Sequence, residues 1–132
     1  MLVEKQATRI KKAHIALMKH PATALYSGVM LMGKNDVVEG NFTAYTDGVN
    51  KRYCADYIAE LNNDALVRAV VLHENLHVAL KHIFRGKEMY KENRKIANLA
   101  VDFVVNDIIA NIKDNAVGSN EPLLQLSENW VY

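Results

Sequence analysis

The chain has 132 residues, half of them hydrophobic, and its sixteen Lys and Arg residues nearly balance fifteen Asp and Glu residues, for a formal net charge of +1. This length suits one domain with a hydrophobic core, so we expect residues 1–132 to form a single domain. The charge balance argues against nucleic acid or an anionic membrane as the main partner. Cys54 is the single cysteine, which excludes an intramolecular disulfide and a cysteine-based zinc site.

The first half of the chain predicts a helix followed by a small sheet. Residues 3–19 carry apolar side chains at helical spacing, and Pro21 ends this helix because the residue before a proline disfavours the α conformation. Residues 27–54 contain short β-type runs. Asp47-Gly48 lies between two of these runs and is typical of a type I′ hairpin turn. We therefore expect a small antiparallel sheet in residues 27–54, with Gly40 at a β-bulge.

The second half of the chain predicts helices. Asn63 or Asp64 can cap the long central helix at its start, and Gly86 suits its C-terminal end. Gly118 begins an irregular tail, residues 118–132, whose apolar residues we expect to pack back on the domain. The expected helices cover residues 55–61, 65–85 and 90–113. The whole pattern predicts an α+β fold.

No part of the sequence suggests export or membrane insertion. No run approaches the roughly 18 consecutive apolar residues that a membrane helix needs. The basic N-terminus lacks the apolar stretch of a secretory signal. We expect a soluble, cytoplasmic protein.

The central helix contains the pattern His-Glu-x-x-His, formed by His73, Glu74 and His77. At 100° per residue, His73 and His77 differ by about 40° around the helix axis, so both rings point the same way. Two such rings can bind one zinc ion, and Glu74 can take a proton from a metal-activated water. The helix is apolar nearly all round, which is typical of a buried helix. Polar groups in such a helix need partners, and a metal ion supplies one.

A zinc site also needs a third protein ligand and an open position for water. His82 follows His73 by nine residues, which is half a revolution around the helix, so we expect it to point away from the site. The longer metzincin pattern requires Gly at position 80 and His at position 83. Leu80 and Ile83 exclude that pattern.

The last helix offers Asp102 as the third ligand. The central helix continues for roughly 14 Å beyond His77, and Asp102 lies roughly 18 Å along the helix that returns. Asp102 therefore arrives near the level of His77, among apolar residues where a carboxylate needs a partner. Its alternative role is that of a capping or ion-pair carboxylate. Asn98 and Asn106, one turn either side, could orient the ligands or lie on a solvated edge.

Residues 43–106 also carry a wider pattern. Its elements are Thr46-Asp47-Gly48, His73-Glu74-x-x-His77-Val78-Ala79-Leu80-x-His82, Arg85, and Asn98-x-Ala100-x-Asp102-x-x-Val105-Asn106. This pattern resembles the zincin-type metallopeptidase domain that precedes a von Willebrand factor A-like domain in some bacterial and phage proteins. The resemblance implies a zincin-like fold with zinc bound by His73, His77 and Asp102, and Glu74 as the general base.

The resemblance further implies peptide-bond hydrolysis in the cytoplasm of a bacterial or phage-infected cell. No von Willebrand-type domain follows Tyr132, so we expect any partner with such a domain to be a separate protein. In zincins an edge strand ahead of the motif helix pairs with the substrate backbone, and here it would lie in residues 37–46 or 49–53. Candidate donors to the developing oxyanion, each with an alternative packing role, are Tyr45, Tyr53 and His82.

The leading hypothesis is therefore a zinc-dependent metalloendopeptidase that acts on a peptide or protein substrate. One alternative is a metal-stabilised protein-binding module without turnover. Another is a metal-dependent endoribonuclease, whose His-x3-His-x5-His spacing is longer by one residue than that of His73, His77 and His82. The near-zero net charge also argues against RNA as the substrate.

Overall fold

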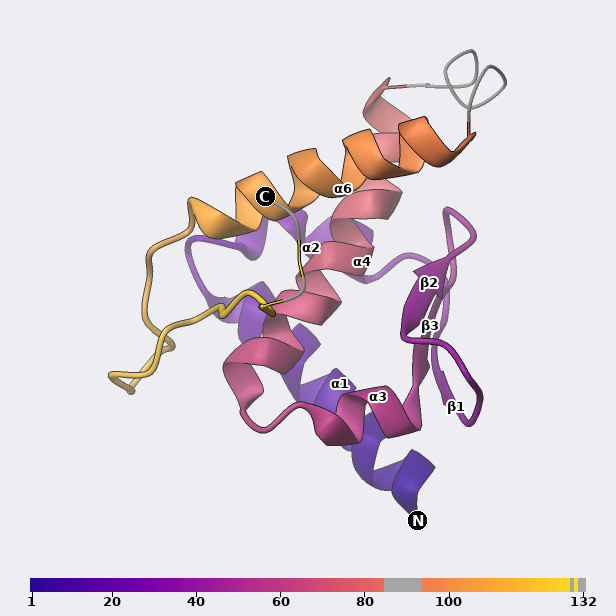
Figure 1. Cartoon of the computed structure of the whole chain (residues 1–132). Coiled ribbons are helices and arrows are strands. Elements are labelled where there is room, and N and C mark those ends of the chain that lie inside the picture. Colours follow the sequence, from indigo (N-terminus) through magenta and orange to yellow (C-terminus); the bar gives the residue numbers. More distant parts are fainter. Residues whose placement is uncertain (85–93, 129, 131–132) are drawn as a thin grey trace.

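The computed structural model describes residues 1–84, 94–128 and 130 (Figure 1). These residues form a mixed α+β fold with five α-helices, one short 3-10 helix and a three-stranded sheet. In chain order the elements are α1 (Leu2–Lys19), η1 (Ala24–Tyr26), α2 (Ser27–Met30), β1 (Asn35–Val38), β2 (Ala44–Thr46), β3 (Lys51–Cys54), α3 (Ala55–Glu60), α4 (Asp64–Phe84) and α6 (Arg94–Ala110).

The predicted helices are present, with ends shifted by a few residues. Helix α1 ends where Pro21 requires, because His20 adopts an extended conformation with φ −81° and ψ 133°. Helix α4 begins after Asn63, whose Oδ1 accepts a hydrogen bond from the backbone N–H of Leu66 at 2.9 Å. This contact satisfies one of the free N–H groups of the first turn. The predicted boundary between the last two helices falls on residues 85–93, outside the described residues.

The sheet is mixed, so the prediction of an antiparallel sheet was only partly right. Its strand order is β1-β3-β2, in which β3 pairs antiparallel with β2 and parallel with β1. The predicted hairpin is present as β2 and β3, but its loop has four residues, 47–50, and not two. Asp47 Oδ1 accepts hydrogen bonds from the backbone N–H groups of Val49 and Asn50. An aspartate that bonds its own backbone in this way stabilises the longer loop.

The prediction for the start of the sheet was wrong in two places. Residues 27–30 form helix α2. The apolar run of residues 29–32, which overlaps this helix, is too short to show a period that separates helix from strand. Gly40 lies in the connection between β1 and β2, and not at a bulge within one strand. Its carbonyl oxygen accepts a hydrogen bond from the thiol of Cys54 at 3.3 Å. This contact ties the connection to the end of β3.

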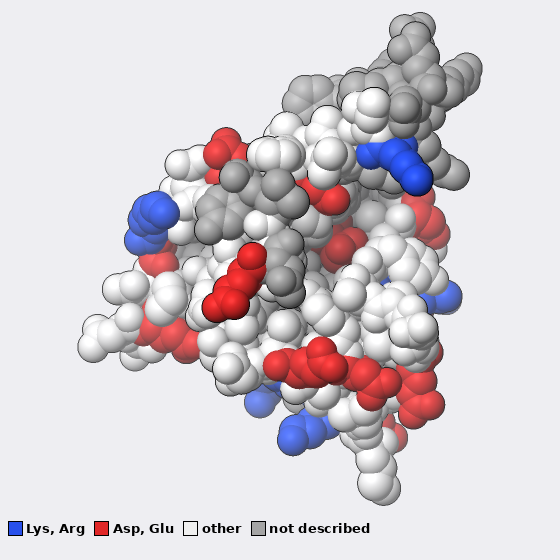
Figure 2. Space-filling view, viewed as in Figure 1, with Lys and Arg blue, Asp and Glu red and all other residues white. Residues whose placement is uncertain are grey.

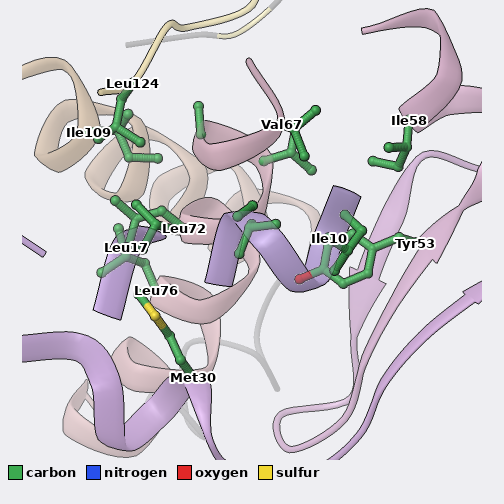
Figure 3. Close-up of a cluster of buried hydrophobic side chains, with 14 of the residues drawn as sticks. Ile10, Leu17, Met30, Tyr53, Ile58, Val67, Leu72, Leu76, Ile109 and Leu124 are labelled. Atoms are coloured by element: carbon green, nitrogen blue, oxygen red, sulfur yellow. The ribbon is translucent and has the colours of Figure 1, made fainter. Parts of the chain in front are cut away.

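The hydrophobic core surrounds α4, which runs through the middle of the molecule between α1, the sheet and α6 (Figure 1). The close-up in Figure 3 shows buried side chains from these elements, from α2 and α3, and from the C-terminal segment gathered around α4. The labelled members of this cluster are Ile10, Leu17, Met30, Tyr53, Ile58, Val67, Leu72, Leu76, Ile109 and Leu124. Within the described residues, no helix is both long enough and apolar enough to cross a membrane.

A buried polar network of Lys51, Asn75 and His14 links α4 to β3 and α1. Lys51 Nζ donates to Asn75 Oδ1 at 2.8 Å and to the carbonyl oxygen of Val29 at 3.1 Å. Asn75 Nδ2 lies 3.1 Å from His14 Nε2, while His14 Nδ1 lies 2.9 Å from the carbonyl oxygen of Ile10. Burial lowers the pKa of Lys51 to about 8 and also lowers the pKa of His14. Through Asn75, the network joins α4 to β3 and α1 and resists rotation of α4 about its axis.

Candidate metal centre

His73 and His77 lie on one face of α4, as their spacing of four residues requires. Their Nε2 atoms are 3.0 Å apart, and their ring centroids are 4.7 Å apart with an interplanar angle of 63°. Each side chain is 14% exposed. Two nitrogen lone pairs this close repel each other unless a proton or a metal ion lies between them. The pair can therefore share a proton or hold a metal ion between its two nitrogens.

Asp102 reaches the same point from α6, which packs against α4. Its Oδ1 lies 2.7 Å from His77 Nε2 and 3.3 Å from His73 Nε2. The Asp102 side chain is 42% exposed, so the site has an open side. The structure thus brings together the three residues that the sequence proposed as ligands, from two helices that lie side by side.

The three donor atoms fit a single metal ion. In a tetrahedral site with zinc–ligand distances near 2.0–2.1 Å, neighbouring ligand atoms are about 3.3 Å apart. Here His77 Nε2 lies 3.0 Å from His73 Nε2 and 2.7 Å from Asp102 Oδ1. The third distance, from His73 Nε2 to Asp102 Oδ1, is 3.3 Å. Binding would need the donors to move apart by only a few tenths of an ångström. Among the described residues, this is the group of His and acidic side chains close enough to hold a metal ion.

Asn106 orients His73. Its Oδ1 lies 2.8 Å from His73 Nδ1, and the residue is 3% exposed. An amide oxygen accepts a hydrogen bond, so His73 donates to Asn106 from Nδ1, and Nε2 is the ring atom that faces Asp102 and His77. In the neutral ring with its proton on Nδ1, Nε2 offers its lone pair to a metal ion. This contact supports the orienting role considered for Asn106. The side chain of Asn98, the other candidate, lies outside the described side chains.

The electrostatics of the site favour positive charge. Burial lowers the pKa of His73, but the hydrogen bond to Asp102 and the charges of Glu74 and Asp102 outweigh burial and raise that pKa above its ordinary value. Burial by itself raises the pKa of Asp102, but hydrogen bonds from His73 and His77 hold it well below its ordinary value. A carboxylate that stays ionised beside two imidazoles is the charge arrangement that a divalent cation requires.

Glu74 lies beside the ligands on α4 and is 7% exposed. Burial raises the pKa of Tyr57 on α3, and the charge of Glu74 raises it further. Burial also raises the pKa of Tyr53 on β3, again with a contribution from Glu74. Glu74 therefore lies near Tyr53 and Tyr57, on the same helix as His73 and His77.

The tail adds an aromatic residue that the sequence did not assign to the site. The ring centroid of Trp130 lies 5.0 Å from that of His73, with an interplanar angle of 41°. The indole N–H of Trp130 also bonds to the hydroxyl of Tyr57, and this bond lowers the pKa of Tyr57. No local pattern predicts either contact, because Tyr57, His73 and Trp130 belong to three separate segments.

The candidate oxyanion donors have different surroundings. Tyr45 on β2 is 47% exposed, and its hydroxyl accepts a hydrogen bond from Arg52 at 3.0 Å. Tyr53 is fully buried, and its hydroxyl has no hydrogen-bond partner among the described residues. The side chain of His82 lies outside the described side chains. Neither described tyrosine contacts His73, His77 or Asp102 by hydrogen bonding.

On the face that Figure 2 shows, acidic side chains are spread over the surface, and some lie in a hollow below α6, while basic side chains lie mainly at the rim. A face with many acidic and few basic side chains disfavours a polyanionic substrate such as RNA.

A comparison with protein families gives a match. A family model described as "Putative metallopeptidase domain" matches residues 5–116, which include both α4 and α6. Comparisons with curated proteins and with solved structures gave no significant match. The family match confirms the resemblance inferred from the motif residues. Since the match covers most of the sequence, the chain belongs to this family of metallopeptidase domains.

Proposed function

We propose that this domain is a zinc-dependent metallopeptidase in which Glu74 acts as the general base. The convergence of His73 Nε2, His77 Nε2 and Asp102 Oδ1 within 3.3 Å carries the proposal. Two nitrogens and one carboxylate oxygen match the donor set of catalytic zinc sites, which leave the fourth position open. The family match supports a metal-dependent hydrolase.

Zinc, when bound, lowers the pKa of coordinated water to about 7 and polarises the carbonyl group that is attacked. The protein supplies the proton transfers. Glu74 takes the proton from the attacking water and passes it to the leaving amine, so that the amine departs uncharged. Burial of Glu74 keeps bulk water from competing for that proton. Asn106 holds His73 in the tautomer that the ligand set needs.

The sheet supplies an edge for the substrate backbone. Strand β3 is the central strand, so the 49–53 alternative for the substrate-binding edge does not fit. Strand β2 lies at the edge of the sheet and packs against α4. An extended peptide can pair with such an edge through main-chain hydrogen bonds, with little sequence preference. The order of sheet, motif helix and ligand-bearing helix supports a zincin-like organisation.

The test compares cleavage of an unfolded protein substrate by the zinc-loaded wild type and by Glu74→Gln. Removal of a general base lowers the rate by about 10²- to 10⁴-fold. Glu60→Gln is the matched control, because Glu60 is exposed on α3 and should leave cleavage unchanged. Equal zinc content in all three proteins must be verified first.

Equal cleavage by the wild type and Glu74→Gln would refute the role of Glu74. A zinc-loaded wild type that binds unfolded substrates but never cleaves them would favour the protein-binding module instead.

A further inference from the structure

The C-terminal segment is anchored along α4 before it reaches the metal centre. Arg68 on α4 is 8% exposed, and its Nε donates to the carbonyl oxygen of Leu123 at 2.7 Å. The backbone N–H of Gln125 donates to the carbonyl oxygen of Ala65 at 3.3 Å. Figure 1 shows this yellow segment crossing in front of α4. Because Leu123 is also 1% exposed, the position of the segment is fixed by core contacts.

Beyond these anchors, the chain turns and places Trp130 over His73. The backbone N–H of Trp130 donates to the carbonyl oxygen of Ser127 at 3.1 Å, which closes the turn. The indole then packs on the His73 ring and bonds to the Tyr57 hydroxyl. Trp130 is only partly buried, so it lies between the core and solvent.

The site that Trp130 occupies, beside His73 and Tyr57, is suited to an aromatic side chain. One wall is the flat His73 ring, at 5.0 Å between centroids, which is within the usual range for aromatic pairs. The Tyr57 oxygen supplies a hydrogen-bond acceptor at the edge of the occupant. The Glu74 carboxylate lies near Tyr57, so this site adjoins the proposed reacting groups.

The two walls and their occupant come from different parts of the chain. Tyr57 and His73 lie within residues 5–116, which the family model matches, whereas Trp130 lies outside that stretch. Residues of the matched domain therefore form the site, and Trp130 of the tail occupies it. Trp130 packs directly on His73, one of the proposed ligands, so a peptide bound at the metal centre would pass close to the space that Trp130 takes.

We propose that Tyr57 and His73 form a subsite for an aromatic side chain of a peptide, and that Trp130 fills this subsite in cis. The tail then competes with the substrate. Peptides with an aromatic residue enter best, because they replace the contacts that Trp130 gives up. The identification of the occupant as a peptide rests on the proposed function, whereas the subsite itself does not.

The direct test uses indole as the probe and Trp130→Ala as the variant. Calorimetry should show that indole binds Trp130→Ala at least ten-fold more tightly than the wild type, in which the subsite is filled. Indene has the same shape without the N–H and should bind several-fold more weakly than indole. Adding Tyr57→Phe to Trp130→Ala should abolish that preference. Val117→Ala changes a 77% exposed residue directly before the tail and should behave like the wild type.

A second test follows peptides. Trp130 is the single tryptophan, so its fluorescence in the wild type reports on the subsite without labels. A peptide with a central Phe should shift the emission to longer wavelength, whereas the same peptide with Ala should not. With zinc bound, Trp130→Ala should lower KM for the Phe peptide about ten-fold and leave kcat within two-fold.

The outcomes separate the subsite from the proposed activity. Indole binding to Trp130→Ala without cleavage by any form would support the subsite and contradict the peptidase. Failure of a cooperatively folded Trp130→Ala to bind indole would overturn the subsite. Weaker binding of the Phe peptide by Trp130→Ala would also overturn it, since Trp130 would then be part of the binding surface and not a competitor.

Discussion

Replacing Asn106 by Ala should weaken zinc binding although no ligand is removed. Asn106 Oδ1 lies 2.8 Å from His73 Nδ1 in a position that is 3% exposed, so water cannot readily replace it. Without this acceptor, neither the tautomer nor the orientation of the His73 ring is fixed. Loss of such a partner costs about 10- to 100-fold in metal affinity. This corresponds to about 1.4 to 2.8 kcal/mol at 25 °C.

Competition with a chromophoric chelator measures the zinc dissociation constant of each variant. Asn106→Asp keeps an acceptor of the same shape, so it should bind zinc at least as tightly as the wild type. Asn111→Ala is the control, because Asn111 is exposed near the end of α6 and bonds the carbonyl oxygen of Asp107. An unchanged dissociation constant for a folded Asn106→Ala would refute the orienting role.

Three further predictions concern stability and use urea denaturation. Arg68→Ala should lower the free energy of unfolding by about 1 to 3 kcal/mol, because the buried carbonyl of Leu123 loses its donor. An unchanged midpoint of urea unfolding would show that Arg68 does not anchor the tail. Burial lowers the pKa of Lys51 from the ordinary 10.5 to about 8. Between about pH 8 and pH 10, Lys51 is therefore protonated in the unfolded chain but largely neutral in the folded protein. The free energy of unfolding should then rise with pH over this range. Lys51→Met should remove this rise, and an equal rise in the variant would contradict the assignment. Leu76→Ala, at a 1% exposed position, should cost about 2 to 5 kcal/mol, whereas a loss below 1 kcal/mol would contradict its place in the core.

Features that depend on neighbouring residues could be predicted from the sequence. His73 and His77 share a face because the helix repeats every 3.6 residues. The hairpin of β2 and β3 follows from the local turn signal at Asp47-Gly48. The placement of Asp102 opposite His77 also follows, since two packed antiparallel helices have a fixed rise per residue.

Features that depend on distant pairing could not be predicted. The parallel pairing of β1 with β3 is set by which edge of β3 remains after the hairpin forms, and no local residue encodes it. The apolar run of residues 29–32, which overlaps helix α2, was too short to show a helical period. Trp130 and Tyr57 meet because the tail crosses α4, and the sequence showed only that the tail is apolar.

The central claim is that His73, His77 and Asp102 hold one zinc ion, and elemental analysis of the purified protein tests it most directly. The wild type and Asp107→Ala, which changes an exposed carboxylate on the same helix, should each contain one zinc ion per chain. Asp102→Ala and His77→Ala should lose most of that zinc while remaining folded. A wild type without stoichiometric metal, or an Asp102→Ala variant that keeps its full zinc content, would contradict the claim.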